Sequence, residues 1–200
     1  MLSKGEETRR HILHCAYGKA RSAGLDGLTI GQLAGDLAMS KSGVFAHFGS
    51  KEELQLAVLK QAADDFIAHV LQPAITSSRG AARIQKVFEL WLRYSALDEQ
   101  AGGCLFIAAA AEFDDRPGAI RDYVSEQQRQ WRQSLMQLVH NAIKHGDLPT
   151  DTDVEQLAFE LFSLVLACHH DRRLMAESSA ASQAQRGLER LLRHPPLKSS

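Results

Sequence analysis

Residues 29–54 read TIGQLAGDLAMSKSGVFAHFGSKEEL and decide the fold of this 200-residue chain. Thr29 is a helix N-cap residue, and Gln32 follows three positions later, where its side chain can bond back to the cap. Ser40 and Ser50 are two further N-caps, and each precedes a run with apolar residues at helical spacing. The stretch therefore predicts two short helices followed by the start of a longer one.

The rest of the chain has the same helical periodicity, with almost no strand alternation. A capping box at Ser3 and Glu6 predicts a first helix that Gly24 ends. Further helices are expected at 50–71, 79–97, up to Phe113, 117–144, from a cap at Asp151 or Thr152 to Cys168, and 182–193, before a frayed tail from Pro195 to Ser200. The sequence predicts an all-α protein.

The third helix presents two different faces. Val44 and Phe48 lie four residues apart and can pack inward against the first two helices. Lys41, Ser42 and Phe45 then point outward or sideways. Three short helices with a projecting third one are the geometry of a helix-turn-helix that docks in the DNA major groove.

Residues 29–34 and 39–54 together resemble the DNA-binding signature of TetR-type regulators. The resemblance implies a helix-turn-helix DNA-binding domain at 1–51 and an effector-binding and dimerisation domain, a helical bundle, at 52–200. Phe45 departs from the pattern, in which Tyr is usual; a phenyl ring keeps contact with a thymine methyl but loses a phosphate hydrogen bond. The DNA contacts implied are Thr29, Ser40, Lys41, Ser42, Gly43, Phe45, His47 and Lys51.

The resemblance also implies a homodimer on a palindromic operator, built by the last two long helices of each subunit. Two recognition helices must then lie about 34 Å apart to enter successive major grooves. Ordinary packing within one chain is the alternative explanation for the apolar residues concerned. The interface expected is Leu157, Leu161, Leu164, Val165, Cys168, Leu188, Leu191 and Leu192.

Most of the aromatic residues lie between positions 88 and 162, which predicts an effector site for an apolar or aromatic small molecule among the middle helices. A plain hydrophobic core explains many of these aromatic residues equally well. Residues with polar groups on large rings are the best candidates because they can orient a ligand. The ligand-binding residues expected are Trp91, Tyr94, Phe106, Trp131 and Phe162.

Composition limits the other functional classes. The net charge is −1, but residues 1–51 carry seven Lys and Arg against four Asp and Glu, so the basic residues lie in front. The N-terminus lacks the apolar stretch of a secretory signal, and no run is long enough to span a membrane, so a cytoplasmic protein is expected. Three cysteines far apart predict reduced thiols, and neither a metal nor another cofactor is expected.

We expect a DNA-binding regulator, most simply a repressor that a small molecule releases, although activation is an alternative. Cys104 begins a helix after two glycines, so an oxidant- or electrophile-sensing thiol is another. The His169-His170-Asp171 run and Glu112 near Asp114 and Asp115 raise an enzyme as a rival, without any accompanying catalytic motif. An adaptor that has lost DNA binding is the remaining rival.

Overall fold

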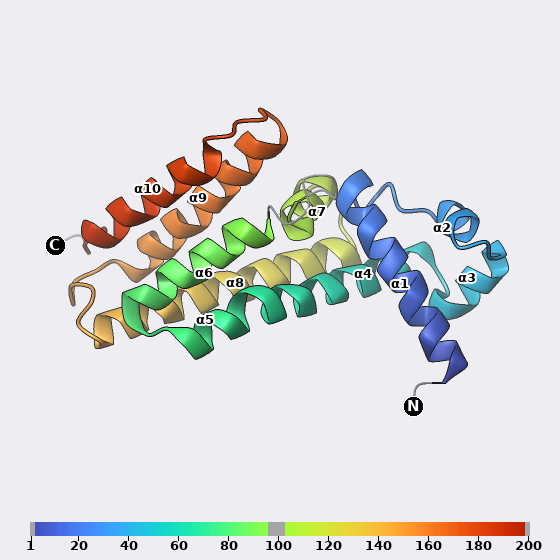
Figure 1. Ribbon diagram of the computed structural model, residues 1–200, viewed down its shortest axis with the longest axis horizontal. Coiled ribbons are helices and arrows are strands. Elements are labelled where there is room, and N and C mark those ends of the chain that lie inside the picture. Colours follow the sequence, from blue (N-terminus) through green and yellow to red (C-terminus); the bar gives the residue numbers. More distant parts are fainter. Residues whose placement is uncertain (1–2, 96–102, 199–200) are drawn as a thin grey trace. The chain divides into compact units, whose positions relative to one another are not determined.

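The computed structural model describes residues 3–95 and 103–198, and helices dominate them (Figure 1). The predicted all-α fold is confirmed. The elements are α1 (Lys4–Ala23), α2 (Ile30–Asp36), α3 (Lys41–Phe48), α4 (Lys51–Phe66), the π-helical turn η1 (Ile67–Leu71), α5 (Gln72–Ser77), α6 (Gly80–Tyr94), α7 (Leu105–Phe113), α8 (Ala119–Lys144), α9 (Val154–Arg173) and α10 (Ala180–Arg193).

The helix ends near the N-terminus follow the predicted caps. Ser3 and Glu6 form the capping box of α1, and the helix ends before Gly24, whose φ of 83° suits a residue without a Cβ. The Ser50 hydroxyl accepts a hydrogen bond of 3.0 Å from the Glu53 backbone N–H, which sets the start of α4.

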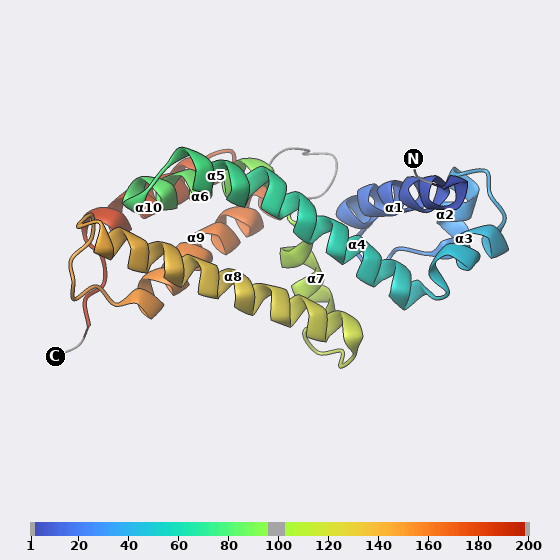
Figure 2. The ribbon, with the colours of Figure 1, turned by 90° about the horizontal axis from the view of Figure 1, so that it is seen from below.

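The chain folds into two compact units. The first contains the chain up to Asp65 and the segment that ends at Glu126; the second contains the segment that begins at Phe66 and the chain from Gln127 onward. Two helices, α4 and α8, pass from one unit into the other along the chain. Figure 2 shows α8 as one unbroken helix.

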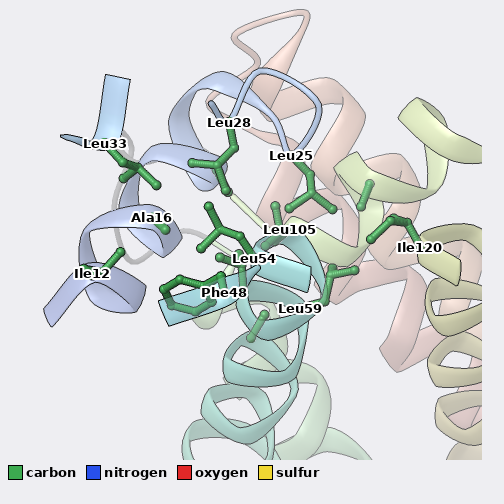
Figure 3. Packing of buried hydrophobic residues seen from close by; sticks show 14 of the residues in the cluster. Ile12, Ala16, Leu25, Leu28, Leu33, Phe48, Leu54, Leu59, Leu105 and Ile120 are labelled. Atoms are coloured by element: carbon green, nitrogen blue, oxygen red, sulfur yellow. The ribbon is translucent and has the colours of Figure 1, made fainter. Parts of the chain in front are cut away.

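The core of the first unit joins the three N-terminal helices to later parts of the chain (Figure 3). Ile12, Leu33 and Val44 are fully buried, and so is Leu54 of α4. Residues of α7 and the first turns of α8 belong to the same cluster, namely Leu105, Ala109, Phe113, Ile120 and Val124. The three N-terminal helices thus share one core with α7 and the start of α8.

The predicted helix at 50–71 is not regular to its end. It is α-helical only to Phe66, and the π-helical turn then leads into α5. Pro73 lacks a backbone N–H and cannot donate to the preceding turn, which gives a physical reason for the altered hydrogen bonding. The Gln72 N–H instead bonds to the carbonyl of Ile67, five residues back.

Two predictions near the C-terminus are wrong in detail. The residue that caps α9 is Asp153, because the Thr152 hydroxyl is buried and donates to the Pro149 carbonyl at 2.7 Å. The described part of the tail is not frayed: the Asp153 N–H donates to the Pro196 carbonyl at 2.8 Å, and Thr152 and Leu197 form an isolated antiparallel bridge. Residues 199 and 200 lie outside the described residues.

The other predicted boundaries shift by only a few residues. α10 begins two residues before Ser182, and α8 begins two residues after Pro117. α6 begins at Gly80 and ends at Tyr94. The predicted end of that helix at Leu97 and the glycine break at Gly102 lie outside the described residues.

Candidate functional site

The exposed face of α3 is the first candidate site. Lys41, Ser42 and Phe45 are exposed on it, while Val44 and Phe48 on the opposite face are buried. Phe45 leaves 52% of its surface open. His47 and Gly43 are half-buried beside this face. The division of the helix into two faces matches the sequence prediction.

The caps of α2 and α3 fix how these helices begin. The Thr29 hydroxyl accepts from the Gln32 backbone N–H at 3.3 Å and donates to the Gln32 Oε1 at 3.1 Å. The Ser40 hydroxyl accepts from the Gly43 N–H at 3.0 Å and lies 3.1 Å from the Ser42 hydroxyl. Both caps leave the helix N-termini exposed, where backbone N–H groups and the helix dipole favour an anion.

Gly31 makes room for Lys41. A Cβ built on Gly31 would lie 3.3 Å from the Lys41 Cε, so the lysine stem crosses α2 where a side chain is missing. The Lys41 ammonium group therefore lies near Gly31, on the surface formed by α2 and α3. This contact was not predicted, although the glycine in the quoted stretch was its signal.

Lys51, a predicted phosphate contact, is engaged within the chain. Its Nζ donates to the Asp26 carbonyl at 2.6 Å and lies 3.5 Å from the Asp26 carboxylate. The same carboxylate accepts from Arg116 at 2.7 Å. The Arg116 hydrogen bond, helped by the charges of Arg116 and Lys51, lowers the pKa of the Asp26 carboxyl from its ordinary value. We call Asp26, Lys51 and Arg116 the Asp26 triad.

Glu112 of α7 clamps the turn that follows α1. Its carboxylate accepts hydrogen bonds from the Leu25 N–H at 3.2 Å and from the Asp26 N–H at 2.7 Å. The buried Gln55 side chain of α4 donates to the Leu25 carbonyl at 2.8 Å. The turn before α2 and α3 is thus held by α7 and α4. Sequence reasoning missed this clamp because Glu112 and Leu25 are 87 positions apart.

Rings from four helices of the second unit (α4, α6, α8 and α9) meet in an aromatic cluster, which we define as Phe66, Trp91, Tyr94, Trp131 and Phe162. Phe66 makes edge contacts with Trp91, Tyr94 and Trp131 at centroid distances of 5.9, 5.6 and 4.9 Å. Trp91 lies 5.0 Å from Trp131 and 5.8 Å from Phe162. Four of the five predicted ligand-binding residues are therefore brought together.

Phe106 is the exception, because it packs partly buried against the core of the first unit. Phe113, another aromatic residue of the same stretch, is also buried in that core. Phe66 belongs to the aromatic cluster but was missed, since it precedes the aromatic-rich range of 88–162. Phe66 continues the apolar repeat of the fourth helix, and this spacing could have predicted that its ring packs inward.

The residues predicted for the dimer interface differ in how far the single chain buries them. Leu157, Leu161, Val165, Cys168 and Leu188 are buried inside the single chain, none more than 4% exposed. They pack where α9 lies against α10 and α6, so they already have partners in one chain. Leu164 is half-buried over Gly187, where an added Cβ would come within 2.6 Å of its Cδ2; Leu191 and Leu192 are also half-buried.

The family with the description "Tetracyclin repressor-like, C-terminal domain" matches residues 80–188, more than half of the chain. The chain belongs to the TetR family. The N-terminal family described as "Bacterial regulatory proteins, tetR family" matches residues 12–58, which contain α2 and α3. The protein is accordingly a TetR-family transcriptional regulator with a helix-turn-helix. A comparison with curated proteins gives no match.

Solved structures share this TetR fold. A TetR transcriptional regulator from Chloroflexus aurantiacus is 22% identical with a TM-score of 0.87, and a TetR-family regulator from Cytophaga hutchinsonii is 22% identical with a TM-score of 0.81; both alignments cover 100% of each chain. A transcriptional regulator from Saccharomonospora viridis, solved in complex with choline, is 22% identical with a TM-score of 0.76, over 97% of this chain and 100% of that one.

Two further residues that sequence analysis considered for chemistry, Cys104 and His169, are largely shielded from solvent. Cys104 is the N-cap residue of α7 and is only 5% exposed. Burial lowers the pKa of His169 to about 4, with the charges of Arg173 and Arg172 adding to the shift. Within residues 3–95 and 103–198, no three metal-ligating side chains gather, and no helix there is long and apolar enough to cross a membrane.

Proposed function

We propose that this TetR-family protein is a homodimeric repressor that binds a palindromic operator and is released from it by a small apolar or aromatic molecule. Residues 1–51 would dock on DNA, and residues 52–200 would bind the effector and dimerise. The observation that carries the DNA-binding part is the exposed face of α3, where Lys41, Ser42 and Phe45 stand on a helix anchored by buried Val44.

Each exposed group on this face suits a different part of DNA. Lys41 and the N-terminal N–H groups of α3 suit a phosphate, and Ser42 and Gly43 allow close approach to base edges. Phe45 suits a thymine methyl. Thr29, Ser40 and His47 would complete the contact from the flanks, Ser40 and Thr29 through groups at the helix caps.

Lys51 would reach its phosphate by exchange. In the free protein its ammonium group is held by Asp26, and a phosphate would take over that position when DNA binds. Arg116 would keep the Asp26 carboxylate paired after the exchange. Because all three side chains are substantially exposed, the exchange would require little desolvation.

Dimerisation would use the outward face of α9 in place of its buried leucines. Phe159 is 51% exposed, and Ala167, eight positions later on the same face, is exposed as well. Half-buried Leu164, Leu191 and Leu192 would add to the apolar area.

The effector would bind at the aromatic cluster. The hydrogen bonds of Glu112 to the turn after α1 would connect α7 to α2 and α3. α8 contributes Trp131 to the cluster and, near its N-terminus, residues to the core that holds α7. A ligand that favours one arrangement of α7 and α8 would thus shift the population of DNA-binding molecules. The burial of Cys104 limits attack by dissolved electrophiles, so we favour ligand binding over thiol sensing.

Selection of bound fragments from random duplex DNA tests the DNA-binding function. We expect a palindromic sequence with half-sites about one helical turn apart. Lys41→Ala should weaken binding to it and reduce the salt dependence by about one phosphate contact, while the matched variant Lys198→Ala in the tail should not. Failure to select any sequence would favour an adaptor that has lost DNA binding.

A further inference from the structure

The two tryptophans of the aromatic cluster have no partners for their indole N–H groups. The Nε1 atoms of Trp91 and Trp131 are buried and make no hydrogen bond with any group in residues 3–95 and 103–198, and Trp91 as a whole is 3% exposed. The Ser95 Oγ is buried without a hydrogen-bond partner too. Ser95 follows Trp91 by one helical turn, and its backbone N–H donates to the Trp91 carbonyl at 2.9 Å. Three unpaired polar groups therefore belong to one small region.

Such a group of unpaired donors needs a physical reason. An indole nitrogen can only donate, so its requirement is met by an acceptor atom alone. Buried donors are nearly always paired in folded proteins, because water must be removed from each of them without replacement. Two of them on rings 5.0 Å apart mark a place where an acceptor oxygen would be stabilised.

The charges around the cluster favour an acceptor over a cation. The Arg132 guanidinium lies 4.5 Å from the centre of the Phe162 ring, so that π-face already holds a positive charge. His69 stacks on Tyr94 at a centroid distance of 6.2 Å. A second cation at these rings would be repelled by Arg132, whereas a carbonyl or carboxylate oxygen would be attracted.

We propose that the effector is a carbonyl-bearing aromatic molecule, neutral or anionic, whose oxygen accepts hydrogen bonds from the indoles of Trp91 and Trp131. Its apolar body packs against Phe66 and Phe162, the apolar rings that contact the tryptophans. The proposal rests on the proposed ligand response and names the ligand class. It also distinguishes this site from one for a quaternary ammonium ion such as the choline of the Saccharomonospora viridis structure.

The chain offers a direct reporter, because Trp91 and Trp131 are its two tryptophans. Calorimetric and fluorescence titrations would compare three probes with similar aromatic bodies: acetophenone, ethylbenzene and phenyltrimethylammonium. Acetophenone should bind saturably and about tenfold more tightly than either of the others, since only it offers a neutral acceptor. Free N-acetyltryptophanamide serves as the control for collisional quenching.

Trp91→Phe and Trp131→Phe each keep an aromatic ring, remove one donor and leave the other tryptophan as reporter. Each should reduce the preference for acetophenone over ethylbenzene several-fold, and Tyr123→Phe, which removes a phenol from the first unit, should not. An unchanged preference in both tryptophan variants would overturn the proposal. So would equal or tighter binding of ethylbenzene or the ammonium probe, or the absence of acetophenone binding.

The DNA-binding function has a separate readout. The tryptophan variants should bind the selected operator as the unsubstituted protein does, because α3 contains neither residue. Operator binding without probe binding would overturn only the ligand class. Loss of the selected sequence in the unsubstituted protein would instead overturn the proposed function.

Discussion

The α2 and α3 region and the α9 and α10 hairpin are both built from short-range helical patterns, yet they use their apolar residues differently. In α3, an apolar side chain, Phe45, is left exposed on a surface otherwise formed by polar and small residues. In α9, Leu157 and Leu161 are buried within the chain, and only Phe159 among its large apolar side chains is as exposed as Phe45. We propose that the first region presents a surface to DNA, while the buried leucines of the second contribute to the stability of the subunit.

This difference shows that the periodicity of an apolar helix face does not reveal which element packs against it. The stripe on α9 is the same whether α10, α6 or a second subunit packs on it. In α3 the helix has only eight residues and is fixed by caps at a known register, so the outward positions follow directly.

Leu161→Ala should have the largest effect on stability. The side chain is 1% exposed, and its removal leaves a cavity that should cost about 2–5 kcal/mol of unfolding free energy. Urea unfolding measures this loss. Phe159→Ala, on the exposed face of the same helix, should cost clearly less at low protein concentration. Equal losses for both, rising with protein concentration, would restore Leu161 to the dimer interface.

Glu112→Ala should have the next largest effect on the free energy of unfolding. It leaves the Leu25 and Asp26 N–H groups without their acceptor, which should cost about 1–3 kcal/mol. Glu112→Gln keeps one carbonyl acceptor and should lose less. Hydrogen exchange at residues 25 and 26 would rise in the alanine variant. Unaltered exchange there would show that α7 does not hold this turn.

Asp26→Asn should strengthen operator binding by about threefold, because it weakens the hold on Lys51 and removes a negative charge near the DNA. Fluorescence anisotropy measures the affinity at a fixed salt concentration. Asp36→Asn is the control with the same charge change, as Asp36 pairs with Lys19 at 2.5 Å. In a Lys51→Gln background the gain should vanish; a gain that persists there would refute the exchange at Lys51.

The smallest expected effect concerns pH. His169 has a folded-state pKa of about 4, below its ordinary value of 6.5. The unfolded chain therefore binds a proton more readily, so stability is present above pH 6.5 and is lost progressively as the pH falls from 6.5 to about 4. Melting temperatures of His169→Gln should fall less over this window than those of the unsubstituted protein. The melting temperatures of His140→Gln, a substitution on the exposed surface of α8, should fall as much as those of the unsubstituted protein.

Much of the fold was predictable because its signals are local. Ser3, Thr29, Ser40 and Ser50 each cap a helix in the predicted place, since a cap depends on residues three positions apart. The outward face of α3 followed from the same register.

The unpredicted features join residues far apart in the sequence. The Glu112 clamp and the Arg116 bond to Asp26 connect positions 86 to 90 residues apart, and no local pattern marks them. The cap at Asp153 instead of Asp151 or Thr152 depends on the tail that returns to Pro196. The contacts of Phe66 with Trp91 and Trp131 also depend on tertiary packing between residues far apart in the sequence.

The central claim is that the exposed face of α3 reads DNA, and site-directed cross-linking tests it most directly. A photoreactive group attached to Ser42→Cys, in a Cys15→Ser background, should cross-link within each half-site of the selected operator. The same group on Ser182→Cys, an exposed position of α10, should not. Cross-links at position 42 confined to the half-sites are the result we predict. Their absence from position 42, on DNA that the labelled protein still binds, would contradict the account.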